Sequence, residues 1–123
     1  MKIINLGRCQ GKTMRLLYAS EFNDMPILCS TYSQKKDLEY RAKKLGLRIP
    51  EPICVADLFN YPVRSRELCE SAILVDEAPS VLQTMLSNFG MHGEIKAMTL
   101  TEKEEEPQTV KYERVDWNEC LFS

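Results

Sequence analysis

The feature that most constrains the fold is a short loop near the N-terminus, between an apolar run and a helix-like segment. Residues 2–6 form the apolar run, residues 7–13 form the loop, and residues 14–18 continue as a helix. A strand, a tight loop and a helix in this order make the first unit of an alternating α/β fold. The start of the chain therefore predicts a sheet with a helix packed on it.

The loop ends in Gly11, Lys12 and Thr13, three residue types that suit a phosphate. Glycine lets the backbone turn tightly and expose its N–H groups, lysine reaches the β and γ phosphates, and a threonine hydroxyl holds Mg²⁺. A helix beginning at Lys12 adds its unpaired N–H groups and the positive end of its dipole. The predicted nucleotide-binding residues are Gly7, Arg8, Cys9, Gln10, Gly11, Lys12 and Thr13.

Another interpretation of the loop is a plain turn with a surface lysine. The usual spacing G-x-x-x-x-G-K-[ST] places a glycine where this sequence has Leu6, and Gly7 comes one position later. The loop alone does not decide between the two interpretations, so a second motif is needed.

The second motif is the pair of carboxylates Asp76 and Glu77, which follows the apolar run 72–75. Such a run is typical of a buried strand in a parallel sheet, and ligands collect at the carboxyl ends of these strands. We expect Asp76 to hold a metal ion together with Thr13, and Glu77 to accept a proton from attacking water. The alternative is that either carboxylate caps a helix starting near Pro79.

With both motifs in place, residues 1–101 resemble the P-loop NTPase superfamily, in the branch of helicases, terminase ATPases and RecA-like motors. L-G-R-C-Q-G-K-T resembles the Walker A motif of phage terminases, and the chain is similar to small single-domain P-loop proteins of phages and prophages. The resemblance implies Mg-ATP or another NTP such as GTP as the ligand, and Lys12 and Glu77 as catalytic residues. The sequence departs from this family in that it shows no second lobe beside the nucleotide-binding one.

Further apolar runs predict the rest of an α/β domain. Strands are expected at residues 2–6, 27–30, 53–55, 72–77 and 95–100, with helices at 12–22, 33–45 and 80–88 and an irregular crossover at 56–69. Right-handed crossovers then give a three-layer α/β sandwich with a mainly parallel five-stranded sheet. The resemblance implies the strand order 5-1-4-3-2.

The composition changes beyond Thr101, so we divide the chain into a nucleotide-binding domain, 1–101, and an extension, 102–123, that packs on or near it. The extension begins with an acidic loop, and residues 110–115 predict an extra C-terminal edge strand. Trp117, Leu121 and Phe122 either fold back onto the sheet or form a docking surface.

The composition of the whole chain excludes several classes of protein. A net charge of −2 argues against broad capture by nucleic acid or a membrane, and no apolar run approaches the length of a membrane span, so a cytoplasmic location is expected. Five cysteines without a C-x-x-C motif, and a lone His92, indicate neither a disulfide framework nor a zinc site.

Several basic residues and threonines are candidates for contacts with nucleic acid, a second subunit or the nucleotide. The basic segment after the second expected strand either contacts nucleic-acid phosphates through Thr31, Lys35 and Lys36, as the resemblance implies, or is a solvated helix face. Arg64 and Arg66 could complete a second subunit's site in trans, in a homo-oligomer or with a protein partner. Thr99 and Thr101 lie where related proteins sense the γ-phosphate.

Three functions are compatible with these patterns. The first is a slow NTPase linked to phage or nucleic-acid metabolism. The second is a nucleotide-gated or degenerate P-loop module that acts through a protein partner, for example a phage factor against a host system. The third is a nucleotide or nucleoside kinase, which the lack of an arginine-rich lid between the fourth and fifth strands disfavours.

Overall fold

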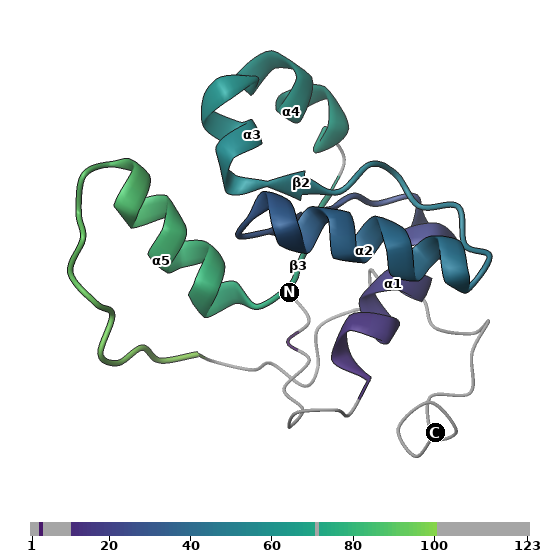
Figure 1. Ribbon diagram of the computed structural model, residues 1–123, viewed down its shortest axis with the longest axis horizontal. Coiled ribbons are helices and arrows are strands. Elements are labelled where there is room, and N and C mark those ends of the chain that lie inside the picture. The colour runs from purple at the N-terminus through teal and green to yellow at the C-terminus, as the bar shows by residue number, and fades with distance from the viewer. Residues whose placement is uncertain (1–2, 4–10, 71, 101–123) are drawn as a thin grey trace.

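The computed structural model of the chain describes residue 3 and the ranges 11–70 and 72–100, and it centres on a small parallel sheet (Figure 1). The described strands are β1 (Ile27–Cys29), β2 (Ile53–Cys54) and β3 (Leu74–Val75), in the order β2-β1-β3. Leu28 pairs with Ile53 on one side of β1 and with Val75 on the other. The central position of β1 agrees with its burial, since all three of its residues are buried.

Helices connect and cover these strands. The described helices are α1 (Lys12–Asn23), α2 (Tyr32–Lys44), α3 (Val55–Asn60), α4 (Pro62–Leu68) and α5 (Ala78–Asn88). Sequence signals set several of their ends: the Thr31 side chain accepts a hydrogen bond from the Gln34 backbone N–H at the start of α2, and Pro62 opens α4, where its missing N–H costs nothing.

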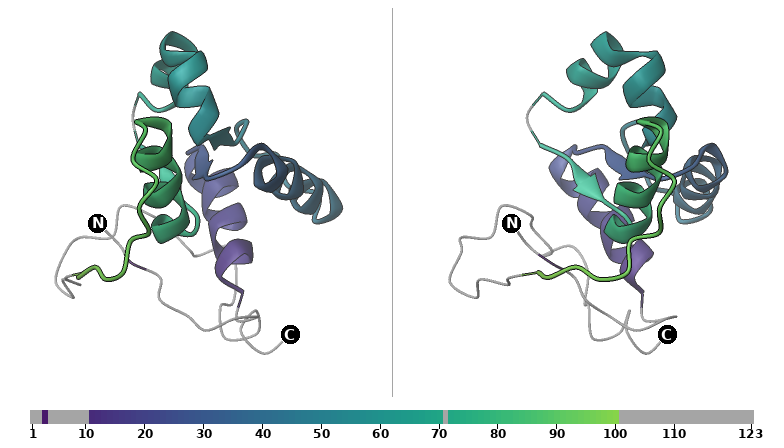
Figure 2. Two further views of the ribbon diagram at one scale, coloured as in Figure 1. Left: turned by 60° about the vertical axis from the view of Figure 1, so that its left-hand side comes forward. Right: turned by 90° about the vertical axis from the view of Figure 1, so that its left-hand side faces the viewer.

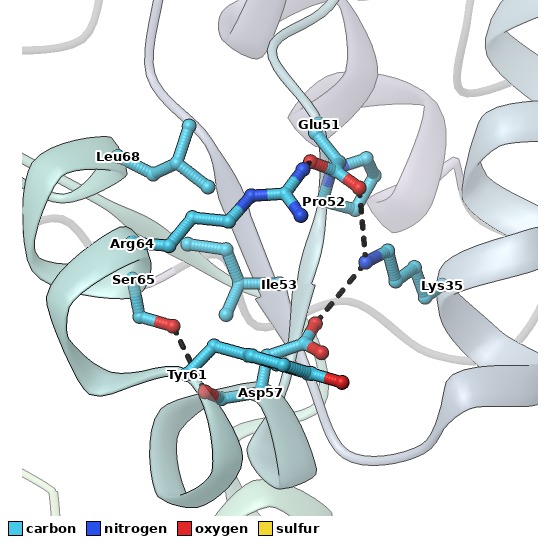
Figure 3. Close-up of a pocket in the computed structure, with 9 residues that line it drawn as sticks. All are labelled: Lys35, Glu51, Pro52, Ile53, Asp57, Tyr61, Arg64, Ser65 and Leu68. Carbon is cyan, nitrogen blue, oxygen red and sulfur yellow. Dashed lines mark hydrogen bonds and ion pairs between the residues drawn. The ribbon is translucent and has the colours of Figure 1, made fainter.

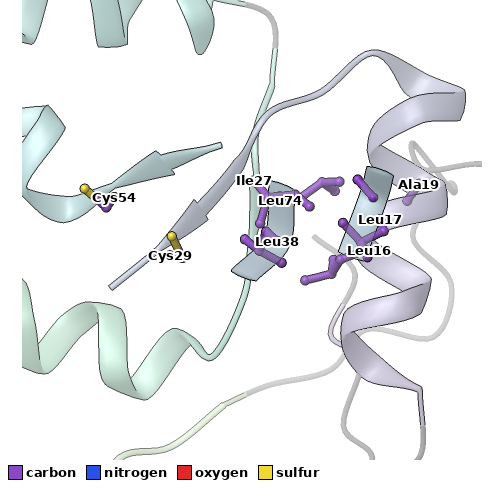
Figure 4. Close-up of a cluster of buried hydrophobic side chains, with 9 residues drawn as sticks. Leu16, Leu17, Ala19, Ile27, Cys29, Leu38, Cys54 and Leu74 are labelled. Carbon is purple, nitrogen blue, oxygen red and sulfur yellow. The ribbon is translucent and has the colours of Figure 1, made fainter. Parts of the chain in front are cut away.

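The two faces of the sheet carry separate apolar cores because side chains alternate along a strand. On one face Ile27, Cys29 and Leu74 pack against Leu17 of α1 and Leu38 of α2 (Figure 4). Burial raises the pKa of the Cys29 thiol to about 12, so this cysteine is an inert part of the core.

On the other face Leu28 and Ile53 pack with Val55 of α3 and Val81 of α5, and Leu68 of α4 adds to the cluster. Helices thus cover both sides of the sheet (Figure 2). The α/β class expected from the sequence is correct.

The expected five-stranded sheet is wrong, and residues 95–100 show why. They form no strand, and Gln83 of α5 takes up backbone groups that a strand would offer to the sheet: its side chain accepts from the Ile95 N–H at 2.7 Å and donates to the Gly93 carbonyl at 2.8 Å. The segment therefore follows α5, and Leu100 is 63% exposed. Of the expected first strand only Ile3 is described, and it is not in a strand.

The expected strand order is also wrong. It placed residues 53–55 between 27–30 and 72–77, whereas 27–29 is the middle strand of the described sheet. The pairing of the strands establishes this order, because β1 pairs with β2 through Leu28 and Cys29 and with β3 through Ile27 and Leu28. The predicted extra edge strand at 110–115 and the extension 102–123 lie outside the described residues.

Candidate nucleotide site

The first half of the candidate site is the N-terminus of α1. Gly11 precedes the helix with φ of 76°, a left-handed conformation that glycine adopts without strain, and Lys12 is the first helical residue. No side chain of the described residues caps this helix end, and its first turn has no acidic residue. Its N–H groups and dipole therefore favour an anion, with Lys12 beside it.

The second half is the carboxyl end of β3. The Asp76 backbone N–H donates to the Leu28 carbonyl at 2.9 Å, which ties this end to the centre of the sheet. The chain leaves β1 for α2 on one face of the sheet and leaves β3 for α5 on the other face. In α/β proteins, ligands commonly bind at the carboxyl ends of adjacent strands whose connections diverge in this way.

An ion pair joins the two halves. Lys12 Nζ donates to Glu77 Oε1 at 3.1 Å, and the side chains are 31% and 49% exposed. The pair links residues 65 positions apart in the sequence. The structure therefore brings together Lys12 and Glu77, the two residues for which the sequence predicted catalytic roles.

The geometry of Glu77 bears on the capping alternative. Glu77 is the N-cap residue of α5 by position, but its side chain makes no capping hydrogen bond and reaches Lys12 instead. Its φ of 54° is left-handed, a conformation that strains a non-glycine residue and that recurs at functional sites as well as at turns. Simple helix capping therefore does not explain this side chain.

Asp76 lies deeper than Glu77 and differs from it in its electrostatics. Burial, followed by the neighbouring charge of Glu77, raises the pKa of the Asp76 carboxyl, and Lys12 acts in the opposite direction. A half-buried carboxylate whose ionised form is disfavoured gains from a cation, so the residue suits a hard divalent ion.

The two residues expected to hold Mg²⁺, Thr13 and Asp76, each carry a side-chain oxygen and are each next in the sequence to a member of the ion pair. In the part of the chain that the structure describes, no cluster of three or more His, Cys, Asp or Glu side chains could hold a metal ion. The donor set fits Mg²⁺ nonetheless, because this ion is commonly bound by one or two protein oxygens together with phosphate and water.

The remaining predicted site residues are those of the loop 7–10 together with Thr99 and Thr101. Gly7, Arg8, Cys9, Gln10 and Thr101 lie outside the described residues. Thr99 is exposed and follows α5 without being part of a strand.

A second polar site, which the sequence did not indicate, lies beside β2 (Figure 3). It is a pocket of about 190 Å³, and Lys35 Nζ lies in it, 3.1 Å from Asp57 Oδ2 and 3.3 Å from Glu51 Oε1. The Lys35 side chain is only 10% exposed. Lys35 is therefore not on the surface that the predicted nucleic-acid contact requires, whereas Lys36 is exposed.

Asp57 organises this pocket. Besides Lys35, it accepts the Cys54 backbone N–H at 3.1 Å and so caps α3. Burial acts to raise the pKa of Asp57, but the hydrogen bonds from Cys54 and Lys35 outweigh it and hold the pKa below its ordinary value. Arg64, one of the two arginines proposed to act in trans, pairs with Glu51 at the rim, while Arg66 is exposed.

Comparison of the chain with known protein families, with curated proteins and with solved structures found no match. Among the described residues, no helix is long and apolar enough to cross a membrane.

Proposed function

We propose that the chain binds a nucleoside triphosphate with Mg²⁺ and hydrolyses it slowly. The observation that carries the proposal is the 3.1 Å contact between Lys12 and Glu77. It places the cation at a helix N-terminus beside a carboxylate at the end of a parallel strand, the combination that phosphate binding and water activation require.

Each residue has a role in this proposal. A bound triphosphate offers Lys12 a more highly charged partner than Glu77, so Lys12 turns to the phosphate and Glu77 is released. Thr13 and Asp76 would hold Mg²⁺, and the ion would supply positive charge to neutralise the phosphate oxygens. Water then attacks the γ-phosphorus, Glu77 accepts its proton, and the bond to the β–γ bridging oxygen breaks so that the nucleoside diphosphate leaves.

The reaction should be slow in the isolated chain. An arginine that meets the charge of the transition state accelerates such reactions by about 10³- to 10⁵-fold. The arginine ion pairs that the structure describes are directed elsewhere, since Arg41 pairs with Asp37 and Arg64 pairs with Glu51. We propose that another chain supplies this group, in a homo-oligomer in which Arg66 is the exposed donor, or from a protein partner.

A nucleotide-gated binding module is the second candidate, and the conformation of Glu77 favours it. Breaking the Lys12–Glu77 ion pair would let Glu77 leave its strained backbone conformation at the start of α5. Nucleotide binding would then change the position of this helix and the surface that it presents to a partner. This candidate needs nucleotide binding but no turnover.

Thermal unfolding with Mg-ATP and Mg-GTP tests the binding step. A ligand at a hundredfold excess over Kd stabilises the folded state by about 2.7 kcal/mol, or roughly 10 °C in a chain of this size. We expect Lys12→Ala to abolish most of this shift, while Lys96→Ala leaves it intact. Lys96 is the matched control because it also pairs with a glutamate, Glu94, at 2.9 Å on the surface.

Phosphate release separates the two candidates. We expect Glu77→Gln to keep the nucleotide-dependent shift and to lose turnover, whereas Asp76→Ala weakens the Mg²⁺-dependent part of binding. A wild-type chain that binds nucleotide without turnover supports the binding module. A wild-type chain with no shift in millimolar nucleotide contradicts both candidates.

A further inference from the structure

The outer face of α2 carries an alternating row of aromatic and basic side chains. Tyr32, Lys36, Tyr40 and Lys44 follow one another at four-residue intervals, so they form one row along the helix surface. We call these four residues the Tyr–Lys stripe. The same helix buries Lys35, Leu38 and Ala42 against the sheet, so the stripe lies on the side away from the core.

The two tyrosines of the stripe are unusually exposed for aromatic residues. Tyr32 is 60% exposed and Tyr40 is 59% exposed. Their only described ring contacts are with lysines of the stripe, since Lys36 Nζ lies 5.2 Å from the centre of the Tyr32 ring and Lys44 Nζ lies 5.4 Å from that of Tyr40. Each lysine is thus held beside a ring whose surface is largely open to a ligand.

The charge of the helix selects the kind of ligand. Apart from the buried Lys35, helix α2 carries four basic and two acidic side chains, although the chain as a whole has a net charge of −2. Asp37 pairs with Arg41 at 2.9 Å and Glu39 lies 3.6 Å from Lys36, while Lys43 and Lys44 form no ion pair with any described carboxylate. The surface is therefore locally positive and suits a polyanion with planar groups.

We propose that the Tyr–Lys stripe binds single-stranded nucleic acid, with bases stacked on the tyrosines and phosphates beside the lysines. Proteins that bind single strands without reading their sequence combine these two elements. Duplex fits less well, because its base faces are stacked inside the helix and closed to a tyrosine ring. The proposal goes beyond nucleotide binding and involves neither Lys12 nor Glu77.

Fluorescence anisotropy with a labelled 20-nucleotide oligo(dT), without nucleotide and at low salt, tests the stacking part. We expect the double variant Tyr32→Ala/Tyr40→Ala to weaken binding about 25-fold or more, because each stacked base contributes roughly a fivefold factor at least. The double phenylalanine variant, which keeps the rings, should bind as the wild type does. Tyr61→Ala is the matched control, since Tyr61 is also 60% exposed but lies between α3 and α4.

Salt titration tests the phosphate part. Removing two phosphate contacts with Lys36→Ala/Lys44→Ala should reduce the slope of log K against log salt by about 1.4, because each contact to a single strand contributes about 0.7. Lys96→Ala, whose side chain is 81% exposed, should leave the slope unchanged. Circular dichroism checks that each variant is folded.

Three outcomes would overturn the proposal. The first is a wild-type chain that does not bind the oligonucleotide at low salt. The second is binding that survives the double alanine variant of the tyrosines. The third is equal affinity for oligo(dT), duplex DNA and heparin, which would indicate a surface for polyanions in general.

Discussion

Lys12 and Lys35 each pair with a carboxylate from a distant part of the chain, yet their surroundings differ. The Lys12–Glu77 pair is 31% and 49% exposed and lies at an uncapped helix end beside a strained residue. Lys35 is 10% exposed and contacts two carboxylates, one of which also caps a helix. The Lys12–Glu77 pair leaves its charged groups accessible to a ligand. The charged groups around Lys35 are instead paired with one another, and this pairing stabilises the fold.

The sharpest test of this comparison replaces each lysine with methionine. We expect Lys35→Met to lower the free energy of unfolding by about 3 kcal/mol, because it leaves the partly buried Asp57 carboxylate without its cation, whereas Glu51 keeps Arg64. Lys12→Met should cost less than about 1 kcal/mol, as exposed ion pairs usually do. Urea unfolding of both variants measures the difference, and equal losses would remove the distinction between the two pairs.

The two aspartates should respond to pH in opposite senses. The folded-state pKa of Asp57 lies below its ordinary value of 3.8, so its ionised form stabilises the fold above that pH, and this contribution is lost as pH falls through the folded-state pKa. The folded-state pKa of Asp76 lies above 3.8, the ordinary value. Ionisation of Asp76 therefore destabilises the folded state as pH rises through the folded-state pKa, and this destabilisation is absent below about pH 3.8.

We therefore expect Asp57→Asn to destabilise the protein at pH 7 by about 1.5 kcal/mol, the scale of a hydrogen bond to a charged group. Asp76→Asn should stabilise it by a smaller amount. Both differences from the wild type should shrink toward pH 3. Unfolding of the two variants and the wild type across this range gives the difference at each pH, and destabilisation by both variants at pH 7 would contradict the assignment.

The smallest expected effect concerns the backbone of Glu77. Glycine adopts a φ of 54° without strain, so Glu77→Gly should stabilise the protein by up to about 1 kcal/mol while removing the group proposed to accept the proton. Asp24→Gly is the matched control, because Asp24 has a φ of 55° at the end of α1 and no role in the site. Loss of stability in the Glu77 variant alone would show that the side chain supports the fold.

The sequence predicted the part of the structure that local patterns determine. Lys12 at the start of a helix and Asp76 at the end of a strand are local features, and the apolar runs at 27–29, 53–54 and 74–75 all became strands. The order of strands depends on which runs pair with each other across the sheet, and single runs do not encode that. Residues 95–100 have the composition of a strand, but the side chain of Gln83 binds their backbone instead.

The second lysine site escaped prediction for the same reason. Lys35 lies in a run of charged residues that resembles a solvated helix face. Its burial depends on Glu51 and Asp57, which approach only when β2 and α3 are in place. One signal could have revealed its position: Lys35, Leu38 and Ala42 are at i, i+3 and i+7, the spacing of residues on one face of a helix.

The central position of β1 also has a consequence for the order in which the chain assembles. Leu28 pairs with Ile53 on one side, but on the other Ile27 pairs with Leu74, across roughly twice the sequence separation. Closing the longer loop costs more chain entropy, by about 0.6 kcal/mol for each doubling of the loop length. Synthesis from the N-terminus also makes β1, α2 and β2 available for folding before β3 has been synthesised. The Lys35–Asp57 pair can therefore form on the nascent chain, while the two halves of the nucleotide site meet only when the last described strand docks.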